Sequence, residues 1–364
     1  MTGRTAVRRH APGKLFIAGE YAVIEPGHPA ILVAVDRQVC VTVSGSDGAE
    51  IVIDSDLGPG RVRLRQADAA QHPAPANFSH VVSAIAVVDE LLTARDRRMP
   101  PIQVSITSGL HRDGTKFGLG SSGAVTVATV AAVAAYSGVE LSPGERFRLA
   151  MLATARHDTR ASGGDLAASV WGGWIAYHAP DRAAVLELAQ RRGIEETLRA
   201  PWPGFRLRRL PPPRGLALEV GWTGQPASTA SLAGRLNTGD WPGSTSHRSF
   251  VARSDECVHA SIRALEQGVD QELMHQVLSA RQVLADLDDE VGLGIFTTRL
   301  TALCDAAEAV GGAGKPSGAG GGDCGIALLD ATASKEIVQL RKEWVAAGVL
   351  PMPIHVEPTN GNEQ

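Results

Sequence analysis

The sequence is poor in lysine, in aromatic residues and in cysteine. Only five lysines stand against thirty arginines, so positive charge is supplied almost entirely by guanidinium groups. Aromatic residues make up 4% of the chain, too few to single out a binding pocket by themselves. The four cysteines have no paired spacing, which argues against a zinc site or a disulfide framework and is typical of reduced thiols in a cytoplasm. They are Cys40, Cys257, Cys304 and Cys324.

Long hydrophobic runs and a strong net charge are also missing. The longest uncharged stretch, about 118–139, is rich in Ala and Thr, and we expect a buried helix there, not a membrane span. A net charge of −4 gives no basic surface for nucleic acid. The first ten residues carry charge but no apolar run, so we expect no signal peptide and a cytoplasmic protein. Its oligomeric state, monomer or homodimer, stays open.

A chain of 364 residues exceeds the usual size of one hydrophobic core, so two domains are expected. Prolines concentrate in 201–215, which we take as the connection between domains 1–200 and 215–364. The apolar patterns indicate mixed helices and strands. Helices are predicted at 80–94, 121–136, 142–156, 246–268, 270–287, 296–310 and 332–347, with a short one near 165–169. Strands are predicted at 31–35, 39–43, 102–106, 172–177, 216–222, 324–329 and 350–356.

Three of the five lysines lie in glycine-rich stretches. These are Ala11-Pro-Gly-Lys-Leu-Phe-Ile-Ala-Gly-Glu20, Lys116-Phe-Gly-Leu-Gly-Ser-Ser-Gly123 and Lys315-Pro-Ser-Gly-Ala-Gly-Gly-Gly-Asp323. Exposed backbone N–H groups together with a compact ammonium group form a phosphate site. The pattern therefore points to an enzyme that uses a nucleotide.

The second stretch has two competing readings. Gly118-Leu-Gly-Ser-Ser-Gly123 matches the glycine pattern of a dinucleotide site, but a capped helix follows it where a second parallel strand is required. It could instead be a plain turn before a buried helix. Its place at a helix N-terminus, the hydroxyls of Ser121 and Ser122 and the nearby Lys116 favour phosphate binding.

The other two stretches also have alternatives. Gly314-Lys315 is not the end of a Walker loop, because Pro316 follows where Ser or Thr is required. The glycines after it could form a flexible linker or let the backbone approach a ligand. Lys14 and Glu20 could be ordinary surface charges, and Asp165 could be a helix cap.

Taken together, the three stretches resemble the motifs of the GHMP kinase family, whose members phosphorylate galactose, homoserine, mevalonate and related small molecules. The three motifs occur in the same order as in the family and are spread over nearly the whole chain. Tyr21 replaces the His that usually follows Gly-Glu in mevalonate kinases, and Lys116 replaces the Pro-x-Gly of the wider family. With Ser162-Gly-Gly-Asp165 and Gly322-Asp323-Cys324-Gly325, these residues resemble the bacterial phosphomevalonate kinase subgroup.

The resemblance implies an α+β protein with two domains. The N-terminal domain would be like ribosomal protein S5 domain 2, and the C-terminal domain would be ferredoxin-like, with ATP and Mg²⁺ bound between them. The implied reaction transfers the γ-phosphoryl group of ATP to 5-phosphomevalonate. An alcohol acceptor, as in mevalonate kinase, is the alternative reaction, and a non-catalytic ligand sensor is the alternative class.

The resemblance also assigns roles to individual residues. Lys14 and Asp165 would act in catalysis, and Ser122 would reach the metal. The ATP phosphates would be bound by Lys116, Gly118, Leu119, Gly120, Ser121, Ser122 and Gly123. The acceptor would be contacted by Lys14, Glu20, His28, Ser162, Asp165, Ser228, Thr229, Ser231, Ser317, Gly318, Ala319 and Gly320. The arginine that binds the acceptor phosphate is not identified by the sequence.

Overall fold

A computed structural model describes residues 4–46, 48, 50–56, 61–65, 78–227, 232, 236 and 241–358. Its first layer is a seven-stranded sheet in the order β4-β3-β5-β2-β8-β9, with β1 also paired to β2. All neighbouring pairs are antiparallel except β3 and β5. The strands are β1 (Val7–Ala18), β2 (Pro29–Gly45), β3 (Glu50–Ser55), β4 (Val62–Arg65), β5 (Ile102–Ser108), β8 (Trp174–His178) and β9 (Arg206–Leu210).

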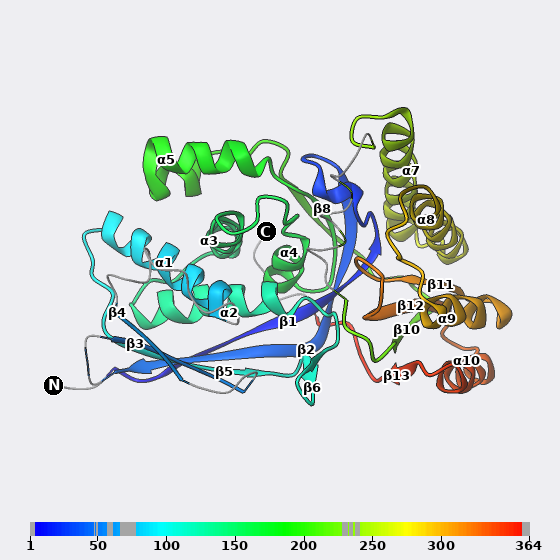
Figure 1. Ribbon diagram of the computed structural model, residues 1–364, viewed down its shortest axis with the longest axis horizontal. Helices are drawn as coiled ribbons and strands as arrows, with labels where there is room; N and C mark the ends of the chain where they lie inside the picture. The colour runs from blue at the N-terminus through cyan, green and yellow to red at the C-terminus, as the bar shows by residue number, and fades with distance from the viewer. Residues whose placement is uncertain are drawn as a thin grey trace.

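Five helices gather on one side of this sheet (Figure 1). They are α1 (Ser79–Ala94), α2 (Ser121–Tyr136), α3 (Pro143–Ala155), α4 (Gly164–Trp171) and α5 (Arg182–Arg199). Helix α2 is buried along most of its length and packs on β1 and β2, as its continuous Ala, Val and Thr composition predicts. Ser142 and Glu145 form the predicted capping box at the start of α3. A small hairpin, β6 (His111–Arg112) and β7 (Thr115–Lys116), precedes α2.

The rest of the chain forms a second sheet of four antiparallel strands in the order β11-β12-β10-β13. These are β10 (Leu216–Trp222), β11 (Ala313–Pro316), β12 (Cys324–Asp330) and β13 (Leu350–Met352). With α9 (Thr298–Ala309) and α10 (Ser334–Ala346), this order is that of a β-α-β-β-α-β ferredoxin-like unit, as expected. A long helical pair, α7 (Thr245–Gln267) and α8 (Asp270–Val291), lies beside it in Figure 1.

Some elements differ from the prediction. The runs 31–35 and 39–43 belong to one 17-residue strand, β2, because its first half pairs with β8 and its second half with β5. Helix α5 was not predicted, and β9 lies within the proline-rich connection 201–215. Strand β11 begins the third glycine stretch, where only a loop was expected. The domain boundaries stay a prediction.

The two sheets are joined by close packing. Helix α7 contacts β1, β2 and the 3-10 turn η1 (Ala22–Ile24) that follows the first motif. The side chain of His28 pairs with Asp255 of α7 at 2.9 Å. This packing places the three glycine stretches next to one another. Within the described ranges, no helix is both long and apolar enough to cross a membrane.

Candidate active site

The three glycine stretches meet at a cavity of about 660 Å³. Its lining includes most of the residues predicted to act on phosphate or acceptor. These are Lys14, Glu20, Lys116, Gly118, Gly120, Ser121, Ser122, Gly123, Ser162, Asp165, Gly318 and Ala319. Segments more than 300 residues apart in the sequence therefore line the same cavity.

Residues 118–123, here called the phosphate loop, lead directly into α2. Gly120 is the N-cap with φ 75°, a left-handed conformation that favours glycine. The first turn of α2 then presents Ser121 and Ser122 to the cavity. Free N–H groups and the positive end of the helix dipole favour an anion at this point.

Lys14 lies between the phosphate loop and the third glycine stretch. Its Nζ donates to the carbonyl of Gly118 at 3.2 Å, and only 8% of the residue is exposed. A Cβ at Gly318 would be 3.7 Å from this Nζ, and one at Gly120 would be 3.0 Å from the Cγ of Lys14. Glycine at Gly120 therefore gives the lysine stem its path, and the Lys14 side chain lines the cavity.

Asp165 lies in the first turn of α4 and faces the same phosphate loop. Gly163 and not Asp165 is the N-cap of α4, but Oδ1 of Asp165 accepts from the N–H of Leu166 at 3.0 Å, so the carboxylate does bind a first-turn N–H of this helix. A Cβ atom added to Gly123 would lie only 2.4 Å from Oδ2 of Asp165, and a Cβ atom added to Gly120 would lie 3.3 Å from the Cβ of Asp165. The Asp165 side chain therefore packs directly on the backbone of both glycines. Because Lys14 also packs on Gly120, the carboxylate and the ammonium group flank the same stretch of backbone.

Glu20 and Lys315 form a buried ion pair that joins the first motif to the third. Lys315 is fully buried, and its Nζ also donates to the carbonyl of Pro316 at 2.7 Å. The N–H of Gly318 lies 3.4 Å from the same Glu20 oxygen. Lys315 is therefore enclosed as a structural cation, although its place beside glycines suggested a phosphate ligand.

Residues 317–323, here called the third glycine loop, are attached to the first motif by two further contacts. Ser317 Oγ accepts from the Phe16 N–H at 2.8 Å and donates to its carbonyl at 3.1 Å. The hydroxyl of Tyr21 donates to the carbonyl of Ala319. Burial, followed by the charges of Asp288 and Glu20, raises the pKa of Tyr21 well above its usual value, so this group stays a donor.

Several predicted residues do not line the cavity. His28 is paired with Asp255 at the contact between the halves, and Ser317 is bonded to the first strand. Leu119 is buried, and its carbonyl accepts from the Lys14 N–H at 2.9 Å. Gly320 packs against Ile295. Ser228, Thr229 and Ser231 lie outside the described residues.

The structure adds lining residues that the sequence did not identify, among them His80, His157, Arg160 and Asp323. Burial lowers the pKa of His80; nearby Asp165 opposes this shift, while His157 and Lys116 add to it. Arg160 is the one arginine in the described lining, and its Nε lies 3.3 Å from Asp158. Only the unusual Gly-Asp-Cys-Gly sequence could have singled out Asp323 in advance.

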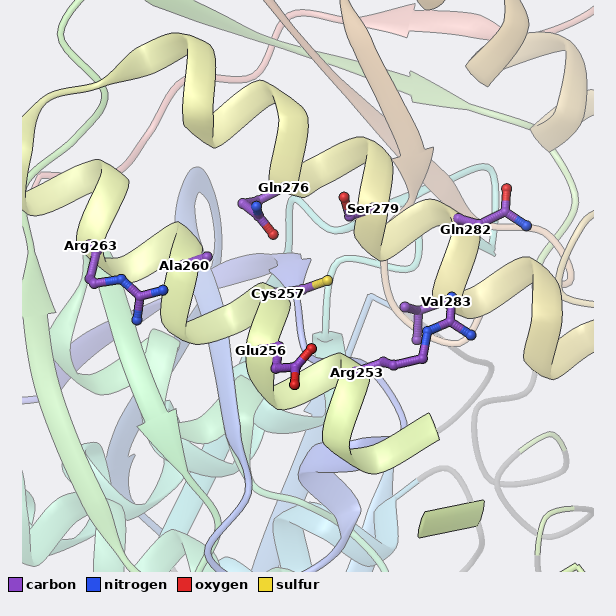
Figure 2. Close-up of a pocket in the computed structure, with 9 residues that line it drawn as sticks. All are labelled: Arg253, Glu256, Cys257, Ala260, Arg263, Gln276, Ser279, Gln282 and Val283. Atoms are coloured by element: carbon purple, nitrogen blue, oxygen red, sulfur yellow. The ribbon is translucent and has the colours of Figure 1, made fainter. Parts of the chain in front are cut away.

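A second hollow, of about 460 Å³, lies between α7 and α8 (Figure 2). Its lining includes Arg253, Cys257 and Arg263 of α7 and Ser279 of α8. None of its lining residues belongs to the glycine-rich stretches, and Arg253 is paired with Asp286 at 2.6 Å. The cavity at the three motifs is therefore the candidate active site.

Known proteins share both the sequence and the fold. The family model of the GHMP kinases N terminal domain matches residues 79–173, and that of the GHMP kinases C terminal matches residues 262–346. A phosphomevalonate kinase from a Streptomyces species is 62% identical over 97% of this chain and 98% of its own length. A mevalonate kinase from Aeropyrum pernix is 29% identical over 90% of this chain and 89% of its own length.

Among solved structures, the Lin0012 protein of Listeria innocua matches with a TM-score of 0.89 and 31% identity, covering 98% of this chain and all of that one. Phosphomevalonate kinase of Streptococcus pneumoniae in complex with phosphomevalonate and AMPPNP matches with a TM-score of 0.85 and 29% identity, covering 97% and 99%. The fold and the similarity to these proteins thus identify the class of protein: a two-domain kinase that acts on small molecules. The chain belongs to the GHMP kinase family.

Proposed function

We propose that the protein transfers the γ-phosphoryl group of ATP to (R)-5-phosphomevalonate, giving (R)-5-diphosphomevalonate and ADP. The observation that carries this proposal is the set of three cationic side chains, Lys14, Lys116 and Arg160, on one cavity with the phosphate loop. A reaction between two phosphate-bearing substrates requires cations close to the phosphates. The same lining also carries four carboxylates, those of Glu20, Asp158, Asp165 and Asp323, so a Mg²⁺ ion brought with the nucleotide would supply the remaining positive charge. The 62% identity to a phosphomevalonate kinase supports the same acceptor.

The phosphate loop and the first turn of α2 are proposed to hold the ATP phosphates. Their N–H groups would bind phosphate oxygens, and Lys14 would contact the group in transfer from its position 3.2 Å from the Gly118 carbonyl. The third glycine loop, held by Glu20, Tyr21 and Phe16, would close the opposite wall with its backbone. Such a transfer depends on positioning and charge neutralisation more than on covalent chemistry.

The donor set fits a Mg²⁺ ion that arrives with the nucleotide. Ser122 and the Asp165 carboxylate both line the cavity at the start of α2 and α4. The described residues contain no cluster of three or more His, Cys, Asp or Glu side chains able to hold a metal alone. Mg²⁺ commonly takes one or two protein ligands and completes its shell with phosphate and water. When bound, it would neutralise phosphate charge, with Ser122 as its proposed protein ligand.

Arg160 is proposed to bind the phosphate of the acceptor, and Lys116, expected to bind ATP, would neutralise the phosphate of ATP or of the acceptor from the same cavity. Arg160 precedes Ala161 and Ser162, which also line the cavity, so the guanidinium group and the Ser162 hydroxyl belong to the same wall. Lys116 approaches from the β7 end of the hairpin and is exposed. Guanidinium groups bind phosphate through two parallel hydrogen bonds, which orients the acceptor as well as neutralising it.

Asp165 is proposed to orient the acceptor and Lys14 without removing a proton. A phosphate monoester has a second pKa near 6, so at pH 7 the attacking oxygen is mostly ionised already. An alcohol acceptor would instead need a base. The position of Asp165 beside Gly120 and Lys14 suits an orienting role.

Initial rates of ADP formation test the proposal on a panel of mevalonate, 5-phosphomevalonate, homoserine and galactose. We expect the highest kcat/KM with 5-phosphomevalonate. A preference for mevalonate would favour the alcohol-acceptor alternative, for which the 29% identity to a mevalonate kinase is the specific observation. ATP binding without turnover on any acceptor would favour a ligand sensor. We also propose that the enzyme acts in the cytoplasm, in keeping with its scattered, unpaired cysteines.

A further inference from the structure

Asp323 has a backbone conformation that glycine adopts more readily. Its φ is 54°, in the left-handed region, and it directly follows Gly320, Gly321 and Gly322. Glycine is required at Gly322, where a Cβ would lie 2.4 Å from the Gln225 carbonyl oxygen. At 323 the chain instead carries a side chain in a left-handed conformation, which indicates that the side chain itself contributes something.

The backbone of Asp323 is fixed to the segment that follows β10. Its N–H donates to the carbonyl of Gln225 at 2.7 Å. Its own carbonyl accepts from the Thr223 N–H at 2.9 Å and from the Thr223 hydroxyl at 3.0 Å. The direction of the Asp323 side chain is therefore set by the second sheet.

The side chain of Asp323 reaches across to the phosphate loop. Oδ1 accepts from the N–H of Ala227 at 3.0 Å. A Cβ built on Gly118 would lie 2.3 Å from both Cβ and Cγ of Asp323 and 2.7 Å from its Oδ2. The carboxyl group thus lies against the bare Cα of the first glycine of the phosphate loop, and Asp323, Ala227 and Gly118 form one continuous wall of the cavity.

A carboxylate repels phosphate anions, so the Asp323 side chain is not suited to bind a phosphate directly. Burial raises the pKa of the Asp323 carboxyl group, opposed by the Ala227 N–H and by the charges of Lys14 and Lys116. A contribution through shape and hydrogen bonding accounts for the side chain without requiring its charge.

We propose that Asp323 is a positioning residue, which sets the phosphate loop relative to the second sheet through its packing on Gly118 and its hydrogen bond to Ala227. The inference rests on the proposed function in that the phosphate loop binds ATP. A displaced loop weakens binding of the nucleotide and slows transfer, because a shift of about 1 Å in a reacting group can cost on the order of 100-fold in rate. The acceptor, bound by other residues, is affected less.

Two substitutions separate shape from charge. Asp323→Ala removes the acceptor oxygen and the packing on Gly118, whereas Asp323→Asn keeps the shape and a carbonyl oxygen for Ala227 and removes only the charge. For Asp323→Ala we expect the KM for ATP and the calorimetric Kd for AMPPNP to rise about tenfold. The value of kcat should fall about tenfold, while the KM for the acceptor should stay within about threefold of the wild-type value. Asp323→Asn should recover most of both losses.

Thr223→Val is the matched control. It removes the hydrogen bonds of the Thr223 hydroxyl to the Asp323 carbonyl and to Gln225. The N–H of Thr223 still donates to the Asp323 carbonyl, and the packing of the Asp323 side chain on Gly118 is kept. We expect it to lower the urea midpoint at least as much as Asp323→Ala while leaving the AMPPNP affinity near that of the wild type.

Three results would each overturn the inference: Asp323→Asn as defective as Asp323→Ala, Asp323→Ala with wild-type affinity for AMPPNP, or Thr223→Val with the same nucleotide defect. The first would assign the effect to charge, and the last to general loosening. AMPPNP titration needs no acceptor, so a wild type that fails to phosphorylate 5-phosphomevalonate would count against the proposed function alone.

Discussion

The buried pair of Glu20 and Lys315 allows a quantitative test of how the two halves are held together. Lys315 has no exposed side-chain surface and Glu20 has 3%. Lys315→Met keeps the length and apolar character of the stem and removes the charge. It leaves the Glu20 carboxylate buried, with the Gly318 N–H at 3.4 Å and no charged partner in its described surroundings.

Removing one partner of a buried ion pair typically costs about 3–5 kcal/mol, because the remaining charge is then desolvated without compensation. We therefore expect Lys315→Met to lower the free energy of unfolding by about that amount. The double variant Glu20→Gln, Lys315→Met leaves no buried charge and should cost clearly less than Lys315→Met alone. Urea unfolding followed by tryptophan fluorescence measures the wild type, the single variants Lys315→Met and Glu20→Gln, and the double variant.

Arg191→Met is the matched control, since Arg191 pairs with Glu187 on the surface, with 75% and 57% of the two side chains exposed. It should change stability little, because solvent screens exposed pairs. A Lys315→Met variant that loses less than about 1 kcal/mol would refute the reasoning. So would a double variant whose loss equals the sum of the two single losses, because the partners would then be energetically independent.

Four further predictions concern the cavity. Asp165→Asn should lose less rate at pH 8 than at pH 6, because the acceptor phosphate, with a second pKa near 6, still carries a proton at the lower pH; equal losses of many thousandfold at both values would contradict an orienting role. Arg160→Gln should raise KM for the acceptor about tenfold or more and leave KM for ATP nearly unchanged, as steady-state kinetics would report. Tyr21→Phe should lower kcat about fivefold, equally at pH 7 and pH 9, because the buried hydroxyl does not ionise in this range. Ser122→Ala should raise severalfold the Mg²⁺ concentration that gives half-maximal rate; an unchanged Mg²⁺ titration would remove Ser122 as a ligand.

Sequence reasoning succeeded where the information is local. Helix starts and ends follow from apolar period and capping, so α1, α2 and α3 agree with their predicted ranges to within about two residues. The glycine-rich stretches also carry local information, since positive φ and close approach require glycine at Gly118 and Gly120. The order of these motifs along the chain also predicted the two-domain α+β architecture. The family models and the similar solved structure confirm that architecture.

Sequence reasoning was incomplete where the structure of a residue depends on a partner that is distant in the sequence. Strand β2 is continuous because β8 and β5 pair with its two halves, and no feature near Asp36 reveals this. His28, expected to contact the acceptor, is paired with Asp255, 227 residues away in sequence, and is not in the cavity lining; its contact with substrate stays a prediction. Arg160 could not be distinguished from the other arginines before the fold placed it on the cavity.

The scarcity of lysine acquires a physical explanation once the cavity is known. Lys14 and Lys315 lie where the backbone is bare and space is narrow, with 8% and 0% of each residue exposed. An ammonium group fits such places because it is compact and has three donor protons, two of which Lys315 uses for Glu20 and the Pro316 carbonyl. A planar guanidinium group would need to displace the backbone around it. Lysine beside glycine is thus found in two settings: Lys14 lines the cavity and is proposed to contact the transferred phosphoryl group, whereas Lys315 joins the first motif to the third. Composition alone cannot separate the two, because the distinction depends on whether a carboxylate such as Glu20 lies within reach.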